Sequence, residues 1–316
     1  MVVHGARPTT RRLCRTLLAF LALAILPGCL FRSRTVERRM SSAVLREATL
    51  AQLVETINHE AARIQTLNAT VDIAPSVGGS KKGKVTDFQD MRGYILLRQP
   101  ATLRMIGLFP ILRNTAFDMV SDGEGFRLSI PTKSRFYVGR NDAPPASNKP
   151  IENLRPRHIL DALLLRPIDP DREIAVLEGS TETVRDPKTK KDIEQPNYVV
   201  TVIRRNGSDW KLSRKITFSR ADLMPYRQVI YDADGSVATE ADYEHITEYH
   251  GGRFPAVIHL WRPKEEYAIV LSMVKLNLNQ PLQDEQFVLN QPEGYELRRL
   301  DKPARPEDAS SGSPPQ

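Results

Sequence analysis

Hydrophobic and polar residues alternate along most of the chain, and a period of two predicts β-strands. Short polar turns separate these runs. We expect strands at residues 69–74, 91–98, 102–106, 115–121, 125–130, 135–140, 173–178, 198–205, 210–219, 225–231, 237–249, 256–261 and 267–278. The dipeptides Asp122-Gly123, Asn206-Gly207 and Asp234-Gly235 separate such runs, and they favour hairpin turns because they accept positive φ.

Two segments have the period of a helix instead. In residues 36–67, Leu50, Leu53, Ile57, Ala61 and Ile64 recur at spacings of three and four and define one apolar face. That face packs on the protein's own sheet or binds a partner. A second helix is expected at residues 156–166, with a proline in its first turn and another proline directly after it.

The remaining segments predict loops and the domain limits. Residues 77–84 are expected to form a flexible polar loop and residues 141–150 a linker loop. The tail at residues 300–316 has few apolar residues and is expected to be disordered. The globular domain then spans residues 46–299. Its fold class is mainly β (α+β), because a long antiparallel sheet of this kind must curl, and the two helices can cover its concave face.

The first 28 residues have the three zones of a secretory signal. A basic start precedes an apolar stretch at residues 17–26, which is shorter than the roughly twenty residues that span a bilayer. The stretch ends in Leu26-Pro27-Gly28-Cys29, which resembles a bacterial lipobox, where cleavage precedes a lipid-modified cysteine. We expect a lipoprotein signal peptide at residues 1–28, and a lipidated Cys29 with a tether at residues 29–45. An ordinary signal peptide and a transmembrane anchor are the alternatives.

Cysteine content and charge agree with this prediction. The chain has two cysteines, and cleavage would remove Cys14 and leave Cys29 without a disulfide partner. A single leftover thiol in an exported protein is explained if it carries lipid. The formal charge of +7 falls to about +3 without the four signal arginines, so we expect no nucleic-acid partner. We expect contact with membrane lipid through acylated Cys29.

Three segments carry a family resemblance. They are residues 59–73, where a helix leads into the first strand; residues 102–123, with strand, apolar loop, strand and Asp-Gly turn; and residues 276–289, with the phrase P-L-x-D-x-x-F. Over roughly residues 51–294 the chain resembles the LolA/LolB-like superfamily of bacterial envelope proteins. That superfamily includes a periplasmic lipoprotein carrier and the outer-membrane lipoprotein that receives its cargo.

The resemblance implies a half-open antiparallel β-barrel whose helices cover an apolar cavity for acyl chains. It also implies the outer membrane, on the periplasmic side, because Leu30 stands where Asp marks retention in the inner membrane. The chain is longer than the carrier or the receptor, with extra material at about residues 141–196. The sequence leaves open whether that segment is a lid or a partner site.

The apolar run at residues 106–112 contains Gly and Pro and no charge. By resemblance to the receptor, a loop here protrudes and touches the membrane, and its contact residues are Leu108, Phe109, Ile111 and Leu112. Each contributes about 1.5–3 kcal/mol if buried in acyl chains. The alternative is that they fill the mouth of the barrel. Arg104 and Arg113 flank the loop, as contacts for lipid phosphates or as a solvated pair.

Signatures of enzymes are missing from the sequence. It has no GxxxxGK[ST], GxGxxG, HExxH or GxSxG, and His59-Glu60 opens HExxR. The segment from Asp232 begins like a calcium loop, but Tyr243 stands where that loop needs a bidentate Glu. We therefore expect no enzyme, no cofactor and no metal site.

Three hypotheses for the function follow. The first is a lipid-anchored protein that binds acyl chains of lipoproteins or lipids in an apolar cavity, without a covalent step. The second is an adaptor or sensor in an envelope complex, with a filled core and no ligand. The third is an envelope hydrolase, for which the sequence offers no converging polar set. The sequence leaves the oligomeric state open.

Overall fold

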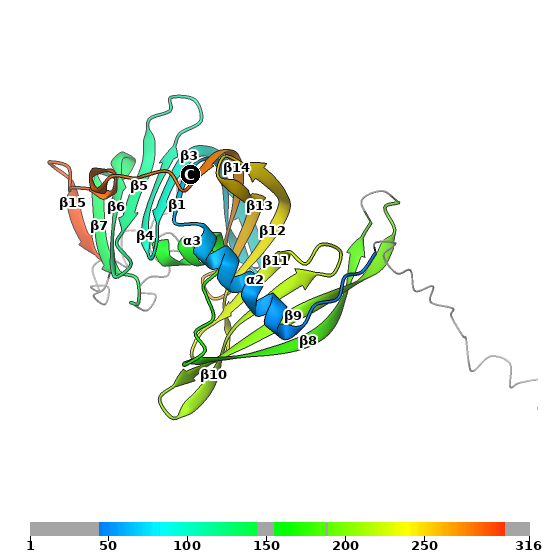
Figure 1. Ribbon diagram of the computed structural model, residues 1–316. Coiled ribbons are helices and arrows are strands. Elements are labelled where there is room, and N and C mark those ends of the chain that lie inside the picture. The colour runs from blue at the N-terminus through cyan, green and yellow to red at the C-terminus, as the bar shows by residue number, and fades with distance from the viewer. Residues whose placement is uncertain (1–43, 82, 144–154, 187–188, 301–316) are drawn as a thin grey trace, which may run out of the picture. The chain divides into compact units, whose positions relative to one another are not determined.

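A computed structural model describes residues 44–81, 83–143, 155–186 and 189–300 (Figure 1). The described residues fall into two units, a small one within residues 184–194 and a large one that holds the others. The predicted signal peptide, Cys29, most of the tether and almost all of the predicted disordered tail lie outside the described residues. So does most of the predicted linker loop.

One 15-stranded sheet dominates the described residues, in the order β15-β7-β6-β5-β4-β3-β1-β14-β13-β12-β11-β10-β9-β8, with β2 paired to β1. The strands are β1 (Thr66–Gly79), β2 (Lys84–Asp87), β3 (Met91–Arg98), β4 (Thr102–Leu108), β5 (Thr115–Ser121), β6 (Gly125–Ile130), β7 (Arg135–Arg140), β8 (Glu173–Arg185), β9 (Asp192–Asn206), β10 (Asp209–Ser219), β11 (Pro225–Tyr231), β12 (Val237–Tyr249), β13 (Gly252–Arg262), β14 (Tyr267–Leu278) and β15 (Glu296–Arg299). The mainly β fold class is confirmed.

Strand β1 joins the two halves of the sheet, because it pairs antiparallel with β3 on one side and with β14 on the other. Its side chains alternate between the two faces, and Leu67, Ala69, Val71 and Ile73 are buried. The sheet curls around that buried face and does not close into a barrel, because β15 and β8 remain its two edges (Figure 1).

Helix α2 (Leu50–Arg63) is shorter than the predicted helix at residues 36–67, of which residues 44–49 are not helical. A capping box sets its start: Gln52 N donates to Thr49 Oγ1 at 3.3 Å, and Thr49 N donates to Gln52 Oε1 at 2.8 Å. It ends at Arg63 because the next residues enter extended backbone and then β1. Leu53, Ile57 and Ala61 on its apolar face are buried.

Helix α3 (Pro156–Leu163) confirms the second predicted helix and lies inside the curve of the sheet (Figure 1). It contacts β5 from one half and β12 and β13 from the other. Ile159, Ala162 and Leu163 join the main apolar core. Leu53 and Ile57 of α2 belong to a second apolar cluster, with Val200 and Val202 of β9 and Ile216 and Phe218 of β10.

The predicted flexible loop at residues 77–84 is largely a hairpin. Val77 pairs with Thr86, Gly78 with Val85 and Gly79 with Lys84. Gly78 has φ of 111° there, and an added Cβ would lie 2.1 Å from the backbone oxygen of Lys84. Two glycines therefore permit a tight strand pair where their composition suggests a loop. Strand β15, parallel to β7, was also not predicted.

The described part of the smaller unit, residues 184–186 and 189–194, forms the turn between β8 and β9. Asp186 N donates to Lys191 O, and Lys190 N donates to Asp186 O, each at 2.8 Å. Thr189 Oγ1 donates to Asp186 Oδ2 at 2.6 Å. These bonds close a local turn in which Lys190 has φ of 56°.

Candidate functional site

The predicted contact loop connects β4 to β5. Phe109 N donates to Asn114 O, and Arg113 N to Phe109 O, each at 3.0 Å, so the loop is a tight turn. Ile111 and Leu112 at its tip are 87% and 80% exposed, whereas Leu108 and Phe109 are half-buried. Two of the four predicted contact residues are thus presented to solvent, and Arg113 is exposed beside them.

The structure separates the two arginines that flank this loop in the sequence. Arg104 makes a two-pronged ion pair with Asp118 of β5, at 3.0 and 2.7 Å, and Nη1 donates to Gln286 O at 2.7 Å. Gln286 lies in the segment with the phrase P-L-x-D-x-x-F. Arg104 therefore holds that closing segment on the sheet, and of the two arginines only Arg113 has an exposed side chain near the loop tip.

The interior of the curled sheet is packed with side chains in the described residues. Leu67, Ile95, Leu97 and Met119, from three strands, are at most 1% exposed, and α3 fills the space above them. An apolar cavity between α2, α3 and β13 measures about 50 Å³. A cavity of roughly 150 Å³ holds benzene. The apolar cavity lined by Ile64, Leu163 and Phe254 is therefore too small for an acyl chain in this conformation.

A larger cavity of about 500 Å³ lies on the other side of α3 and is polar. It is bounded by α3, the end of β7, and β9 to β13 with the turn after β13. Six basic side chains line it, against four acidic ones. The basic ones are Arg155, Arg157, Arg166, Arg204, Arg262 and Lys264. Its volume lies within the roughly 300–1,000 Å³ range of ligand pockets.

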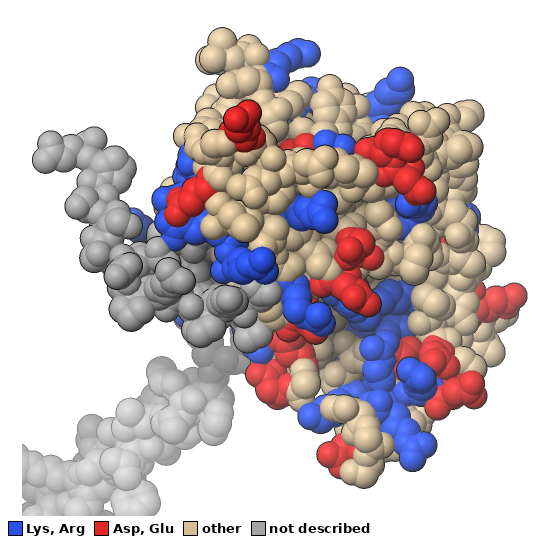
Figure 2. Space-filling view, turned by 90° about the vertical axis from the view of Figure 1, so that its left-hand side faces the viewer, with Lys and Arg blue, Asp and Glu red and all other residues tan. Residues whose placement is uncertain are grey.

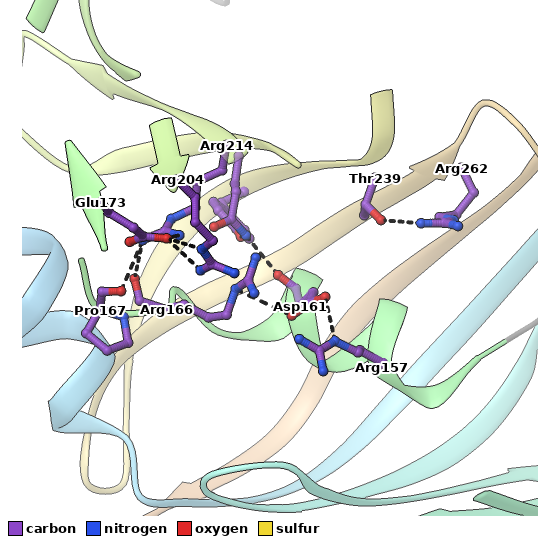
Figure 3. A network of polar contacts seen from close by, with 11 residues as sticks. Arg157, Asp161, Arg166, Pro167, Glu173, Arg204, Arg214, Thr239 and Arg262 are labelled. Carbon is purple, nitrogen blue, oxygen red and sulfur yellow. Dashed lines mark hydrogen bonds and ion pairs between the residues drawn. The ribbon is translucent and has the colours of Figure 1, made fainter. Parts of the chain in front are cut away.

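One carboxylate lies between two arginines at the edge of this cavity. Asp161 Oδ2 is 3.7 Å from Arg157 Nε, and Asp161 Oδ1 is 3.7 Å from Arg166 Nε (Figure 3). Both distances are ion-pair contacts that are too long for hydrogen bonds. Arg166 Nε is buried and has no hydrogen-bond partner among the described residues. Arg166 therefore keeps an unused donor, and the side chain of Arg157 is half-exposed to solvent.

The neighbouring arginines are occupied. Glu173 accepts from Arg214 at 3.0 Å and from Arg204 Nε at 2.8 Å, and Arg214 also donates to Pro167 O at 3.0 Å (Figure 3). Burial opposes ionisation of Glu173, but the bonds and charges of both arginines outweigh it and lower its pKa. This cluster ties β8, β9 and β10 to the segment after α3.

The opposite wall of the cavity is also paired. Arg262 donates to Glu265 with Nε and Nη2, at 3.0 and 2.9 Å, and to Thr239 Oγ1 at 2.9 Å. Lys264 Nζ donates to Asp232 and Asp234, at 2.7 and 3.0 Å. These contacts fix the wall and leave few donors there.

His158 of α3 lies between the cavity and the core. Its Nδ1 is 3.0 Å from the hydroxyl of Tyr267, whose pKa burial raises. Burial, and then the charges of Arg262, Arg155 and Arg157, hold the pKa of His158 well below its usual value. The imidazole is therefore neutral at pH 7, and three positive charges act on it.

Charge on the face seen in Figure 2 is mixed, with Lys and Arg interleaved with Asp and Glu.

The arginine-lined cavity was not predicted from the sequence. The segment at residues 155–166 carries five of its lining residues, among them Arg155, Arg157 and Arg166. The arginines in this segment were a possible signal of the cavity. The other lining residues, on β9 and after β13, are distant from them in sequence.

The described residues hold no group of three or more His, Cys, Asp and Glu side chains arranged to hold a metal ion. Within the same residues, neither helix has the length and hydrophobicity required to cross a membrane.

No family model matches the sequence, and no curated protein matches it. Solved structures do match in fold. One is a LolA superfamily protein, NE2245 from Nitrosomonas europaea, at 13% identity and a TM-score of 0.47, over 77% of this chain and 99% of that one. Another is a DUF1329 family protein from Desulfovibrio piger, at 14% identity and a TM-score of 0.47, over 75% and 95% of the chains. Both are similarities of fold at low sequence identity.

Proposed function

We propose that this protein is a lipid-anchored, periplasm-facing protein of the bacterial outer membrane that engages membrane lipid through its β4–β5 loop. The observation that carries the proposal is the exposure of Ile111 and Leu112, at 87% and 80%, on a tight turn. Burial of two such side chains in acyl chains contributes about 3–6 kcal/mol. The lipobox-like segment ending at Cys29 supports an anchor that would bring the loop to the bilayer.

Packing favours an adaptor or sensor over an acyl-chain carrier. The space inside the curled sheet is filled by α3 and by side chains that are nearly inaccessible to solvent. A carrier with a ready-made pocket would need several hundred Å³ of apolar volume. In this proposal the folded domain is held at a lipid surface as a rigid body. It presents polar side chains to the periplasm.

Acyl-chain binding, in lipoprotein or lipid transfer, is the second candidate. The small cavity between α2 and α3 supports it, because apolar side chains that include Leu163, Leu164 and Met224 line it. A fluorescent fatty acid tests this candidate. Saturable binding at micromolar probe supports a carrier, and no saturable binding leaves the adaptor.

The membrane contact can be tested with single thiols, because the mature chain has no cysteine besides Cys29. Leu112→Cys is labelled with a polarity-sensitive fluorophore, and the lipidated protein is reconstituted in phosphatidylethanolamine–phosphatidylglycerol vesicles. We expect a blue shift, and quenching by brominated acyl chains. Val85→Cys on β2, also exposed, is the matched control and should show neither.

Equal emission from the labels at positions 112 and 85 would refute the contact. Mass spectrometry of the protein from membranes checks the anchor separately. We expect an N-terminal fragment that begins at Cys29 and carries acyl mass, and an unmodified cysteine would refute the lipoprotein assignment.

A further inference from the structure

The polar cavity beside α3 has features that neither membrane contact nor the apolar core requires. It is about 500 Å³ in volume, and basic side chains outnumber acidic ones by six to four among its lining residues. Four of its charged groups hold one another in close ion pairs, Arg262 with Glu265 and Lys264 with Asp232. Arg157 and Arg166 differ, because each contacts Asp161 at 3.7 Å without a hydrogen bond.

This arrangement leaves guanidinium donors available on one side of the cavity. Arg166 Nε is buried without a hydrogen-bond partner among the described residues, and a buried unsatisfied donor is destabilising. Arg157 is half-exposed on α3, one turn from Asp161. One carboxylate faces two guanidinium groups, so a second anion would complete the charge balance and satisfy the donors.

We propose that the cavity binds a phosphate group of a small molecule or lipid headgroup, held between the guanidinium groups of Arg157 and Arg166. Arginine is suited to this role because its planar donors match two oxygens of a phosphate at once. The cavity volume of about 500 Å³ leaves room for the uncharged part of the ligand. This inference goes beyond the membrane contact and does not depend on it.

Electrostatics on α3 agrees with this site. His158 follows Arg157 directly, and the charges of Arg262, Arg155 and Arg157 add to burial in keeping its imidazole neutral. Three arginine side chains therefore contribute positive charge around His158. A phosphate would offset that positive charge and accept hydrogen bonds from guanidinium groups that now face Asp161 across 3.7 Å.

The test is direct binding to the full chain in mild detergent, by isothermal titration calorimetry at constant ionic strength. The probes are inorganic phosphate, glycerol 3-phosphate and dihexanoyl phosphatidylglycerol below its micellar concentration. We expect saturable binding of at least one probe. The Arg157→Gln/Arg166→Gln variant should bind it at least about ten-fold more weakly, since each charged hydrogen bond contributes about 1.5–3 kcal/mol.

Two further variants keep the test informative. Arg172→Gln/Arg205→Gln makes the same change in net charge outside the cavity lining and should bind like the wild type. Asp161→Asn removes the competing carboxylate and should tighten binding several-fold, which a purely structural role of Asp161 would not produce.

The three probes separate the sources of the phosphate. Tighter binding of glycerol 3-phosphate or inorganic phosphate identifies a soluble ligand, and binding of the short phospholipid alone identifies a headgroup. No saturable binding of any probe would overturn the proposal. Equal weakening in the Arg172→Gln/Arg205→Gln control would also overturn it, because the effect would then be general charge.

Discussion

Arg214 Nη1 and Glu173 Oε1 lie 3.0 Å apart, and their side chains are 0% and 1% exposed. This pair joins the middle of β10 to the start of β8, and Arg214 also reaches the carbonyl oxygens of Arg166 and Pro167. The edge of the sheet and the exit of α3 are thus held by a charged pair inside the protein. Glu173 also accepts from Arg204 Nε at 2.8 Å, so its charge keeps a partner without Arg214, whereas the buried charge of Arg214 depends on Glu173.

The first prediction concerns this pair. Glu173→Leu should lower the free energy of unfolding by about 3–5 kcal/mol, because it leaves the buried charge of Arg214 without its carboxylate, and Arg214→Met should lower it less, because Glu173 keeps its bond from Arg204. The double variant should lose clearly less than the sum of the two. Urea unfolding of the four proteins measures this coupling. Additive losses would show that the pair has no mutual stabilisation.

The second prediction concerns a close approach within the sheet. A Cβ added at Gly93 of β3 would lie 2.4 Å from Ile73 Cδ1 and 2.7 Å from the backbone oxygen of Ile106. Gly93→Ala should therefore cost about 1–3 kcal/mol through displaced neighbours. Gly179→Ala is the matched control, since nothing lies within 4 Å of an added Cβ on β8. It should leave stability unchanged or raise it by up to about 1 kcal/mol. Thermal unfolding of both variants measures the two changes in stability.

The third prediction concerns pH. Burial and the charges of Arg262, Arg155 and Arg157 keep the pKa of His158 well below its ordinary value of about 6.5. Below pH 6.5 the unfolded chain therefore binds a proton at this position that the folded protein does not. The part of the free energy of unfolding that depends on a neutral His158 is fully present above pH 6.5. It is lost as the pH falls below that value, by up to about 1.4 kcal/mol per pH unit.

Urea unfolding between pH 7.5 and 5.5 measures that slope. His158→Gln should make it smaller, because glutamine does not titrate. Tyr267→Phe removes the hydroxyl that contacts His158 Nδ1 at 3.0 Å but keeps the histidine, so it should keep the slope. An unchanged slope in His158→Gln would assign the pH dependence to other groups.

The strands were predictable because the alternation of burial along each one is local. Strands β3, β5, β6, β7, β11, β12 and β14 have the bounds that the pattern predicts. Errors arose where a local signal was weak or overlooked. The capping pair Thr49 and Gln52 starts α2 well inside the predicted helix, and Gly78 and Gly79 pair in a hairpin although they suggest a loop.

The predicted site was located in part. Ile111 and Leu112 are presented as expected for a contact loop, and that contact stays a prediction. Arg104 was expected beside lipid or solvent, but its guanidinium group donates to Asp118 and to the carbonyl oxygen of Gln286. Asp118 is 14 residues away in the sequence, on the neighbouring strand, and Gln286 is 182 residues away. Only pairing of β4 with β5 and the return of the closing segment bring them to one guanidinium.

By itself, the sequence determined the mainly β class, the apolar face of each helix and the lipobox-like segment before Cys29, because these depend on residues close together in the chain. The tertiary structure decided that α3 fills the curve of the sheet and that Arg157, Arg166, Arg204 and Arg262 line one cavity. Those residues come from α3, the segment that follows it, β9 and β13, so their common electrostatic field exists only once long-range strand pairing has placed them together.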